Sequence, residues 1–190
     1  MNTHGIVFAV STSLLAGGLA ADNIEPRRWT PLPMGTTVLG AGVIRSEVDI
    51  AFDPVLQIED ATEETTTTVV SVIRAFDLLG QTARLDIRLP YKHSRWKGLL
   101  EGEPRSADRR GPGDPRLRLS VNFLGSPALR GREYRAYRAS HPVNTIAGAA
   151  LAVTLPLGEY QKDKLLNLGR NRFAITPQLG LVHARGPWSY

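Results

Sequence analysis

The sequence predicts an all-β protein, an antiparallel up-and-down β-barrel of the outer-membrane type. Hydrophobic and polar residues alternate with a period of two along several segments, as in a strand that has one apolar face. Several of these segments reach the roughly nine to eleven residues with which a tilted strand crosses a bilayer. After the first positions the sequence has no apolar run of about 20 residues, which argues against a transmembrane helix.

Length and composition suit one folded domain. The chain has 190 residues, 42% of them hydrophobic, so it can bury a sizeable core. Its net charge of +5 is also found in proteins that bind nucleic acid. We expect no nucleic-acid partner, because the arginines alternate with aliphatic residues and do not cluster on a recognition helix.

Residues 1–21 have the features of a secretory signal peptide. A short apolar region from Gly5 to Ala21 ends in small residues, and cleavage is predicted after Ala20 or Ala21. Since no Lys or Arg precedes the apolar region, a buried first helix or strand stays an alternative. The chain has no cysteine, which excludes a lipoprotein anchor and a disulfide scaffold. Residues 22–35 are rich in proline and predict an extended lead-in.

Residues 36–190 predict about six strands and the start of a seventh. In Ala83–Tyr91, apolar side chains share one face while Arg84, Asp86 and Arg88 share the other. Arg116–Phe123 repeats this pattern. The weaker strands are Thr36–Ile50, Thr65–Phe76, Val143–Leu155 and Arg172–Val182, and Trp188–Tyr190 begins the seventh.

The lengths of the connections indicate which ends of the strands lie together. Long polar loops are expected at 51–64, 92–114 and 158–169, all at one end, and short turns at 79–81 and 185–187 at the other. Outer-membrane barrels have long external loops and short periplasmic turns, so the N-terminus is predicted to be periplasmic. The exception is 125–142, where Ala128 to Arg138 predicts a helix. This helix is expected to be solvated at the surface or docked at the inner rim.

Several blocks of sequence resemble the family of outer-membrane proteins named for the meta-pathway of phenol degradation. Residues 76–84 and then 89–91 look like that family's first hairpin. Residues 113–129, which begin Gly-Asp-Pro, are similar to its most distinctive stretch. Residues 156–160 and 167–173 resemble a later block, which usually ends in Trp where this chain has Phe173.

The order and spacing of these blocks agree from Trp29 to the last residue, so the chain is identified as a member of that family. The resemblance implies a barrel of roughly a dozen strands that passes hydrophobic or aromatic compounds. It supplies no catalytic or ligand residues. Because members continue beyond the equivalent of Trp188, we expect an amino-terminal fragment that forms an open, curved sheet.

The facing of the strands follows from the cost of placing charge in lipid, about 2 to 4 kcal/mol for an arginine at the midplane. The polar faces must therefore point into the lumen. A three-residue loop at Leu79-Gly80-Gln81 would place Arg74 opposite Asp86 and inside, whereas a two-residue loop would place it opposite Leu85. The residues predicted to face the lumen are Arg45, Glu47, Asp49, Arg74, Arg84, Asp86, Arg88, Arg116, Arg118, Ser120 and Asn122.

No motif of an enzyme, a metal site or a cofactor site is recognisable in the sequence. It has no Gly-x-Ser-x-Gly elbow and no His-Glu-x-x-His, and its four histidines are scattered. We therefore expect no catalytic residues, metal or cofactor. Two functions stay open: a channel or transporter for small hydrophobic or aromatic compounds, or an exported β-protein with a ligand-binding or structural envelope role. The expected partners are outer-membrane lipid and small aromatic or hydrophobic solutes.

Overall fold

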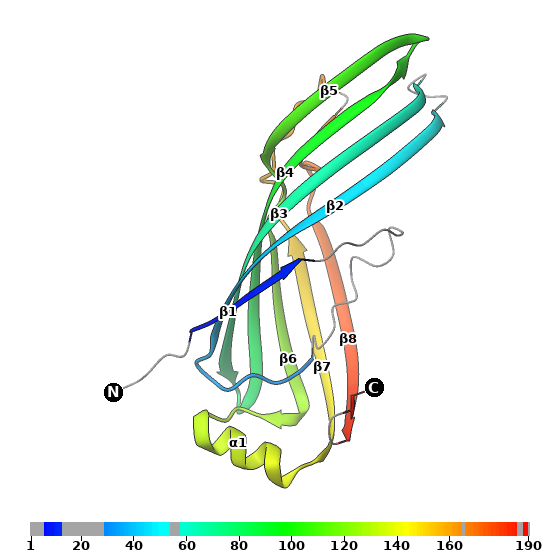
Figure 1. Ribbon diagram of the computed structural model, residues 1–190. Helices are drawn as coiled ribbons and strands as arrows, with labels where there is room; N and C mark the ends of the chain where they lie inside the picture. Colours follow the sequence, from blue (N-terminus) through cyan, green and yellow to red (C-terminus); the bar gives the residue numbers. More distant parts are fainter. Residues whose placement is uncertain (1–5, 13–28, 54–57, 165, 186–187, 190) are drawn as a thin grey trace.

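The computed structural model describes residues 6–12, 29–53, 58–164, 166–185 and 188–189. These residues form one sheet and one short helix (Figure 1). The elements are β1 (Ile6–Thr12), β2 (Thr37–Asp53), β3 (Ile58–Leu78), β4 (Gln81–Leu100), β5 (Glu103–Pro112), β6 (Arg116–Pro127), α1 (Gly131–Ser140), β7 (Val143–Thr154), β8 (Ala174–Arg185) and β9 (Trp188–Ser189).

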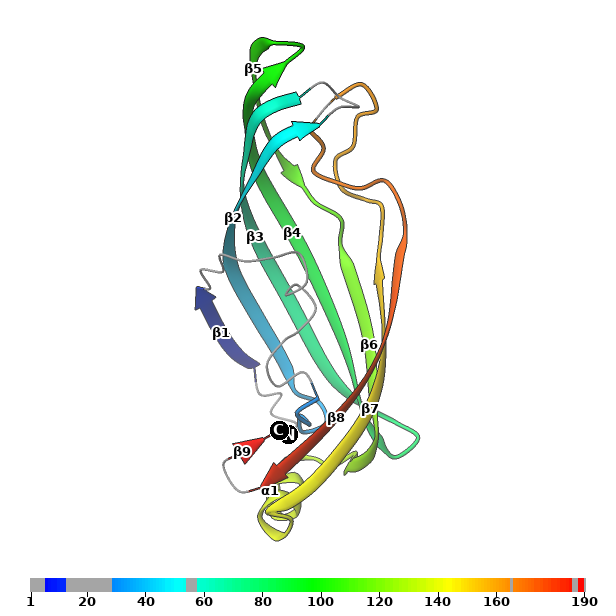
Figure 2. The same cartoon turned by 90° about the vertical axis from the view of Figure 1, so that its right-hand side faces the viewer.

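The sheet is open and curved, as predicted. Its strand order is β1-β2-β3-β4-β6-β7-β8-β9, with β5 beside β4. All pairs are antiparallel except β1 and β2, which are parallel. Figure 2 shows the sheet bending around a concave side while β2 and β8 stay apart. The predicted all-β, antiparallel fold is therefore confirmed.

The predicted strands are present, but those nearest the N-terminus are much longer than expected. β3 has 21 residues and β4 has 20, against the nine to eleven that cross a bilayer. The extra length was predicted as loops at 51–64 and 92–114, and this prediction was wrong. Instead β2, β3 and β4 continue, and β5 pairs with the outer half of β4 from Tyr91 to Leu100. On the inner face of these extended ends, Ala61 of β3 and Trp96 of β4 are buried against Leu166 of the β7–β8 connection.

β5 and β6 together form a single neighbour for β4. β4 pairs with β5 through Tyr91 and Pro112, and with β6 through Arg88 and Arg116. The register shifts by one residue between these two pairs, at the Gly-Asp-Pro turn of residues 113–115. As in a β-bulge, one extra residue on one side of the pairing changes the direction in which the following side chains point. It keeps the polar residues of β6 on the same face as those of β4.

The sheet has two chemically different faces. The face we call the outer face exposes large apolar side chains, and Leu179 is 84% accessible. The opposite face, here the inner face, holds buried polar groups such as Asp86, Arg118 and Asn122. Apolar residues exposed on the outer face are Val43, Val70, Leu85, Leu89, Leu119, Leu151, Ile175, Leu179 and Leu181. The alternation along each strand produces this separation.

Two segments outside the strands cover the inner face. Residues 29–36, from the predicted lead-in, cross the sheet beside α1 (Figure 1). The connection between β7 and β8 lies at the far end of the strands (Figure 2). The helix begins three residues after the predicted start, and no residue in it is buried. No helix among the described residues has the length and apolar character needed to span a membrane.

The signal peptide stays a prediction. Both proposed cleavage positions, after Ala20 and Ala21, lie outside the described residues, and so do residues 186 and 187 of the predicted last turn. Residues 6–12 form β1, which lies along the first part of β2.

Candidate functional site

The candidate site is a ladder of polar side chains on the inner face of β4 and β6. Asp86 lies directly opposite Arg118, and Arg84 lies opposite Ser120. Residues that face each other across an antiparallel pair point to the same side of the sheet. The side chains are well shielded, with 7% of Asp86, 6% of Arg118 and 12% of Arg84 exposed. The alternation in the sequence correctly predicted that these side chains share a face.

Asp86 bridges two arginines. Its Oδ2 atom accepts hydrogen bonds from Arg118 at 3.0 Å from Nε and 2.8 Å from Nη2. Its Oδ1 atom lies 3.2 Å from Nε of Arg84. Buried charges are tolerated when they are paired and hydrogen-bonded, so the carboxylate is what allows both guanidinium groups to be placed here.

The ladder is rich in arginine. Arg88 and Arg116 lie opposite each other one step further along the same face. Arg84, Arg88, Arg116 and Arg118 therefore share this face with Asp86.

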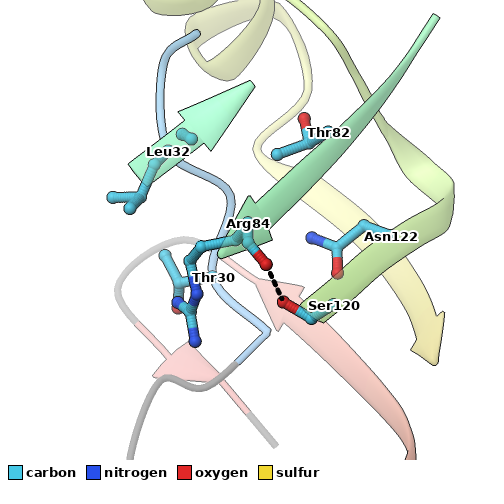
Figure 3. Close-up of a pocket in the computed structure, with 7 residues that line it drawn as sticks. Thr30, Leu32, Thr82, Arg84, Ser120 and Asn122 are labelled. Carbon is cyan, nitrogen blue, oxygen red and sulfur yellow. Dashed lines mark hydrogen bonds between the residues drawn. The ribbon is translucent and has the colours of Figure 1, made fainter. Parts of the chain in front are cut away.

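The lead-in closes the space above the ladder. Nδ2 of Asn122 donates a hydrogen bond to the carbonyl oxygen of Trp29, at 3.1 Å. Thr30 and Leu32 stand over Arg84 and Thr82 (Figure 3). The cavity left between them measures about 10 Å³, which is room for about one water molecule. No aromatic solute fits in it while the lead-in holds this position.

The helix holds the lead-in from the other side. The hydroxyl of Tyr134 donates to the carbonyl of Pro31 at 2.8 Å, and the amide of Met34 donates to the carbonyl of Leu129 at 2.8 Å. Burial raises the pKa of Tyr134 above its ordinary value, so the phenol keeps its proton, and can donate, further into the alkaline range than a free tyrosine. The helix has no buried residue, and Tyr134 joins it to the lead-in, so the choice between a solvated helix and one docked at the inner rim stays a prediction.

Three predicted ladder residues lie on the opposite face. Arg45 pairs with Thr66, which pairs with His93, and this row continues the outer-face positions of Leu85 and Leu89. Glu47 and Asp49 follow Arg45 at two-residue intervals and share its face. The prediction for all three was wrong. It assumed that the whole of β2 crosses the apolar zone, whereas these residues lie in the outer part of a 17-residue strand.

The predicted register of the β3–β4 hairpin was also wrong. Arg74 pairs with Leu85, and Asp86 pairs with Ile73, so Arg74 is a fourth residue that was predicted to face the lumen and lies on the outer face. The loop has two residues, Leu79 and Gly80, with φ of 54° and 79°, as a tight hairpin turn requires. Arg74 nevertheless finds polar partners near the strand ends, because its Nη1 donates to the carbonyl of Gly35 and to Oγ1 of Thr37 at 2.9 and 2.5 Å.

A second cluster joins sequence blocks that lie far apart in the chain. Oδ1 of Asp114 accepts the amide of Gly158 at 2.9 Å, and Oδ2 accepts the amide of Arg170 at 2.7 Å. A side chain at Gly158 would reach within 2.7 Å of Asp114, and one at Gly169 within 2.9 Å. Both positions therefore need glycine. The Gly-Asp-Pro turn thus fastens the β7–β8 connection to the sheet.

The same connection is fastened by an ion pair. Nη2 of Arg109 bonds to Oε1 of Glu159, and its Nη1 bonds to the carbonyl of Leu166. The amides of Leu168 and Gly169 donate hydrogen bonds to the carbonyl of Glu159. Sequence analysis did not single out Arg109 as part of a site. Its strand contains two prolines and many charges, which is unfavourable for a central strand but acceptable at an edge.

On the outer face beyond the apolar zone, Asp108 of β5 contacts two basic side chains of β4. His93 Nε2 lies 3.0 Å from Oδ1, and Arg95 Nε lies 3.0 Å from Oδ2. Hydrogen bonds from His93 and then Arg95 lower the pKa of Asp108. The pair is exposed, so solvent screening keeps its effect on stability small.

Together, the fold and the site define a class of protein: a single antiparallel sheet with an apolar exposed face and a charged, covered inner face. The chain belongs to the family described as "Putative MetA-pathway of phenol degradation", whose family model matches residues 35–190. This confirms the family suggested by the sequence blocks. No curated protein and no solved structure matches the chain.

Proposed function

We propose that the protein is an outer-membrane β-barrel protein that lets small hydrophobic or aromatic compounds cross the membrane. The observation that carries this proposal is the exposed apolar face, which extends over β2, β3, β4, β6, β7 and β8. A contiguous apolar surface of this extent is a liability in water and is favourable against lipid. Lipid-facing and lumen-facing residues alternate in membrane barrels, as they do here.

The family supports the class of solute. Its description refers to phenol degradation, so aromatic compounds are the natural candidates for passage. The inner ladder adds a preference for phenolates and aromatic carboxylates, because Arg84, Arg88, Arg116 and Arg118 lie on one face of β4 and β6. Arginine binds such groups through charge-assisted hydrogen bonds and by stacking on the ring.

Uptake into liposomes tests both parts of the proposal. The full-length protein would be reconstituted, and uptake of benzoate would be compared with uptake of an aromatic amine. We expect benzoate to enter faster, and expect Arg88→Glu/Arg118→Glu to lose or reverse the preference. Because Arg118→Glu also breaks the pair with Asp86, Arg88→Gln/Arg116→Gln serves as a second variant that keeps this pair. Equal uptake of both solutes by the unmodified protein would contradict the anion preference.

One observation favours the second candidate, an exported β-protein that binds a ligand or supports the envelope without transport. The lead-in covers the part of the inner face around Arg84 and Asn122, and the cavity between them holds about one water molecule. Extraction separates the candidates, because an outer-membrane channel requires detergent for extraction. They also differ in liposomes, where the second predicts no solute uptake above that of protein-free vesicles.

A further inference from the structure

The indole ring of Trp29 lies against two glycines of the inner face. A side chain at Gly180 would come within 1.9 Å of the ring nitrogen of Trp29, and one at Gly148 within 2.6 Å of ring carbon Cε3. Real side chains do not approach so closely, so any other residue at either position would displace the ring. The two glycines provide the room in which the ring lies.

The glycines are neighbours across the sheet. Gly148 of β7 lies directly opposite Gly180 of β8, and Asn122 of β6 lies opposite Gly148 on its other side. Adjacent strands are about 4.8 Å apart, so two side-chain-free positions in one row expose a backbone platform about as wide as an aromatic ring. Glycine within a strand often marks a place where another group approaches the backbone closely.

A buried amide borders this platform. Asn122 is 6% exposed, and its Oδ1 lies 2.7 Å from where a side chain of Gly148 would begin. Its Nδ2 is bound to the carbonyl of Trp29. If Trp29 withdraws, this donor loses its partner in a shielded place, where an unpaired polar group is costly. A ligand that can accept a hydrogen bond would restore the pairing.

We propose that Gly148, Gly180 and Asn122 form a binding site for a planar aromatic ring, which Trp29 occupies in this structure. The proposal rests on the proposed function and specifies where the aromatic solute binds. The ring lies on the glycine platform, and a hydroxyl or carboxylate substituent accepts from Asn122. Arg84 lines the same cavity as Asn122, so an anionic substituent faces positive charge. The solute must compete with Trp29, which is present at high effective concentration because it is tethered.

Removal of the competing ring tests the site. Trp29→Gly leaves a vacancy that matches indole, so radiolabelled indole serves as the probe in equilibrium dialysis of the detergent-solubilised, full-length protein. We expect Trp29→Gly to bind about one equivalent of indole and the unmodified protein to bind it at least about tenfold more weakly. We expect phenol to compete and cyclohexanol, which is not planar, to compete much less.

A matched pair of second substitutions locates the binding. Trp29→Gly/Gly180→Ala places a methyl group where the ring lies and should weaken indole binding at least about tenfold, in the range expected for forced overpacking. Trp29→Gly/Leu181→Ala changes the adjacent residue on the outer face and should bind as Trp29→Gly does. Gly148→Ala replaces Gly180→Ala if the latter does not fold, as judged by heat-modifiable migration in gels.

The outcomes separate this inference from the proposed function. If Trp29→Gly binds no more indole than the unmodified protein, or if neither glycine substitution weakens binding, the site is refuted even when liposomes take up benzoate. If indole binds as expected and liposomes take up no solute, the site stands and transport is refuted.

Discussion

Removing the carboxylate of Asp86 should destabilise the sheet more than any other single charge change on the inner face. Asp86→Asn keeps the shape of the side chain and removes the carboxylate that pairs with both Arg84 and Arg118. Both guanidinium groups are shielded from water, with exposed fractions of 12% and 6%. Breaking a buried pair from one side leaves a charge that is neither solvated nor compensated.

The size of the effect follows from the geometry. Loss of one partner of a buried ion pair costs roughly 3 to 5 kcal/mol. The guanidinium of Arg84 is slightly more exposed and lies further from the carboxylate, so we place the effect near the lower end, at about 3 kcal/mol. A free energy of this size is a large part of the stability of an ordinary domain.

The assay is urea unfolding of the full-length protein in lipid vesicles, followed by far-ultraviolet circular dichroism. Asp108→Asn is the matched control, because it removes an aspartate that is exposed and also contacts two bases. The control should leave the midpoint unchanged. Replacing both partners, in Asp86→Asn/Arg118→Gln, should recover part of the loss. If Asp86→Asn shifts the midpoint no more than Asp108→Asn does, the ladder is not a stabilising network.

Two further predictions concern the segments that cover the inner face. Asp114→Ala removes the carboxylate that accepts hydrogen bonds from the amides of Gly158 and Arg170. We expect the free energy of unfolding to fall by about 2 kcal/mol and proteolysis in the β7–β8 connection to become faster, measured by mass spectrometry of the fragments. Unchanged cleavage would show that Asp114 does not hold this segment. Tyr134→Phe removes the hydrogen bond to Pro31, worth about 1 kcal/mol, and should speed hydrogen exchange at the amide of Met34 about fivefold, whereas an unchanged rate would show that the helix does not secure the lead-in.

The sequence predicted the fold where alternation was strong. In residues 83–89 of β4 and 116–123 of β6, apolar and polar residues alternate, and the ladder of Arg84, Asp86 and Arg118 was predicted from that pattern alone. The pattern failed where strands continue beyond the apolar zone. The outer part of β2 carries Arg45 and Glu47 on the outer face, beyond the apolar zone. The cost of placing charge in lipid does not determine which way such residues face. β5 was missed for a related reason, because an edge strand needs neither an apolar face nor high strand propensity.

The contacts that cover the inner face were beyond the reach of sequence reasoning. Trp29 precedes Gly148 and Gly180 by more than a hundred residues, and no local pattern links them. The prediction of the β3–β4 hairpin register was wrong because the loop is one residue shorter than expected. The shorter loop requires a positive φ at Leu79, which is uncommon for leucine. By contrast, the sequence blocks at 113–115, 156–160 and 167–173 were visible, and the structure supplies their physical reason: they meet around Asp114.

The cover on the inner face has a consequence for transport under the proposed function. Three of the hydrogen bonds that hold the lead-in are donated by Asn122, Tyr134 and the amide of Met34, and together these three contribute about 3 kcal/mol. Burial of the Trp29 ring adds to this. A preference of 3 kcal/mol leaves less than about 1% of molecules with the lead-in displaced. We therefore expect the path across the protein to be closed in most molecules. An aromatic solute would open it by taking the place of the Trp29 ring on the glycine platform, which would allow the lead-in to leave the inner face.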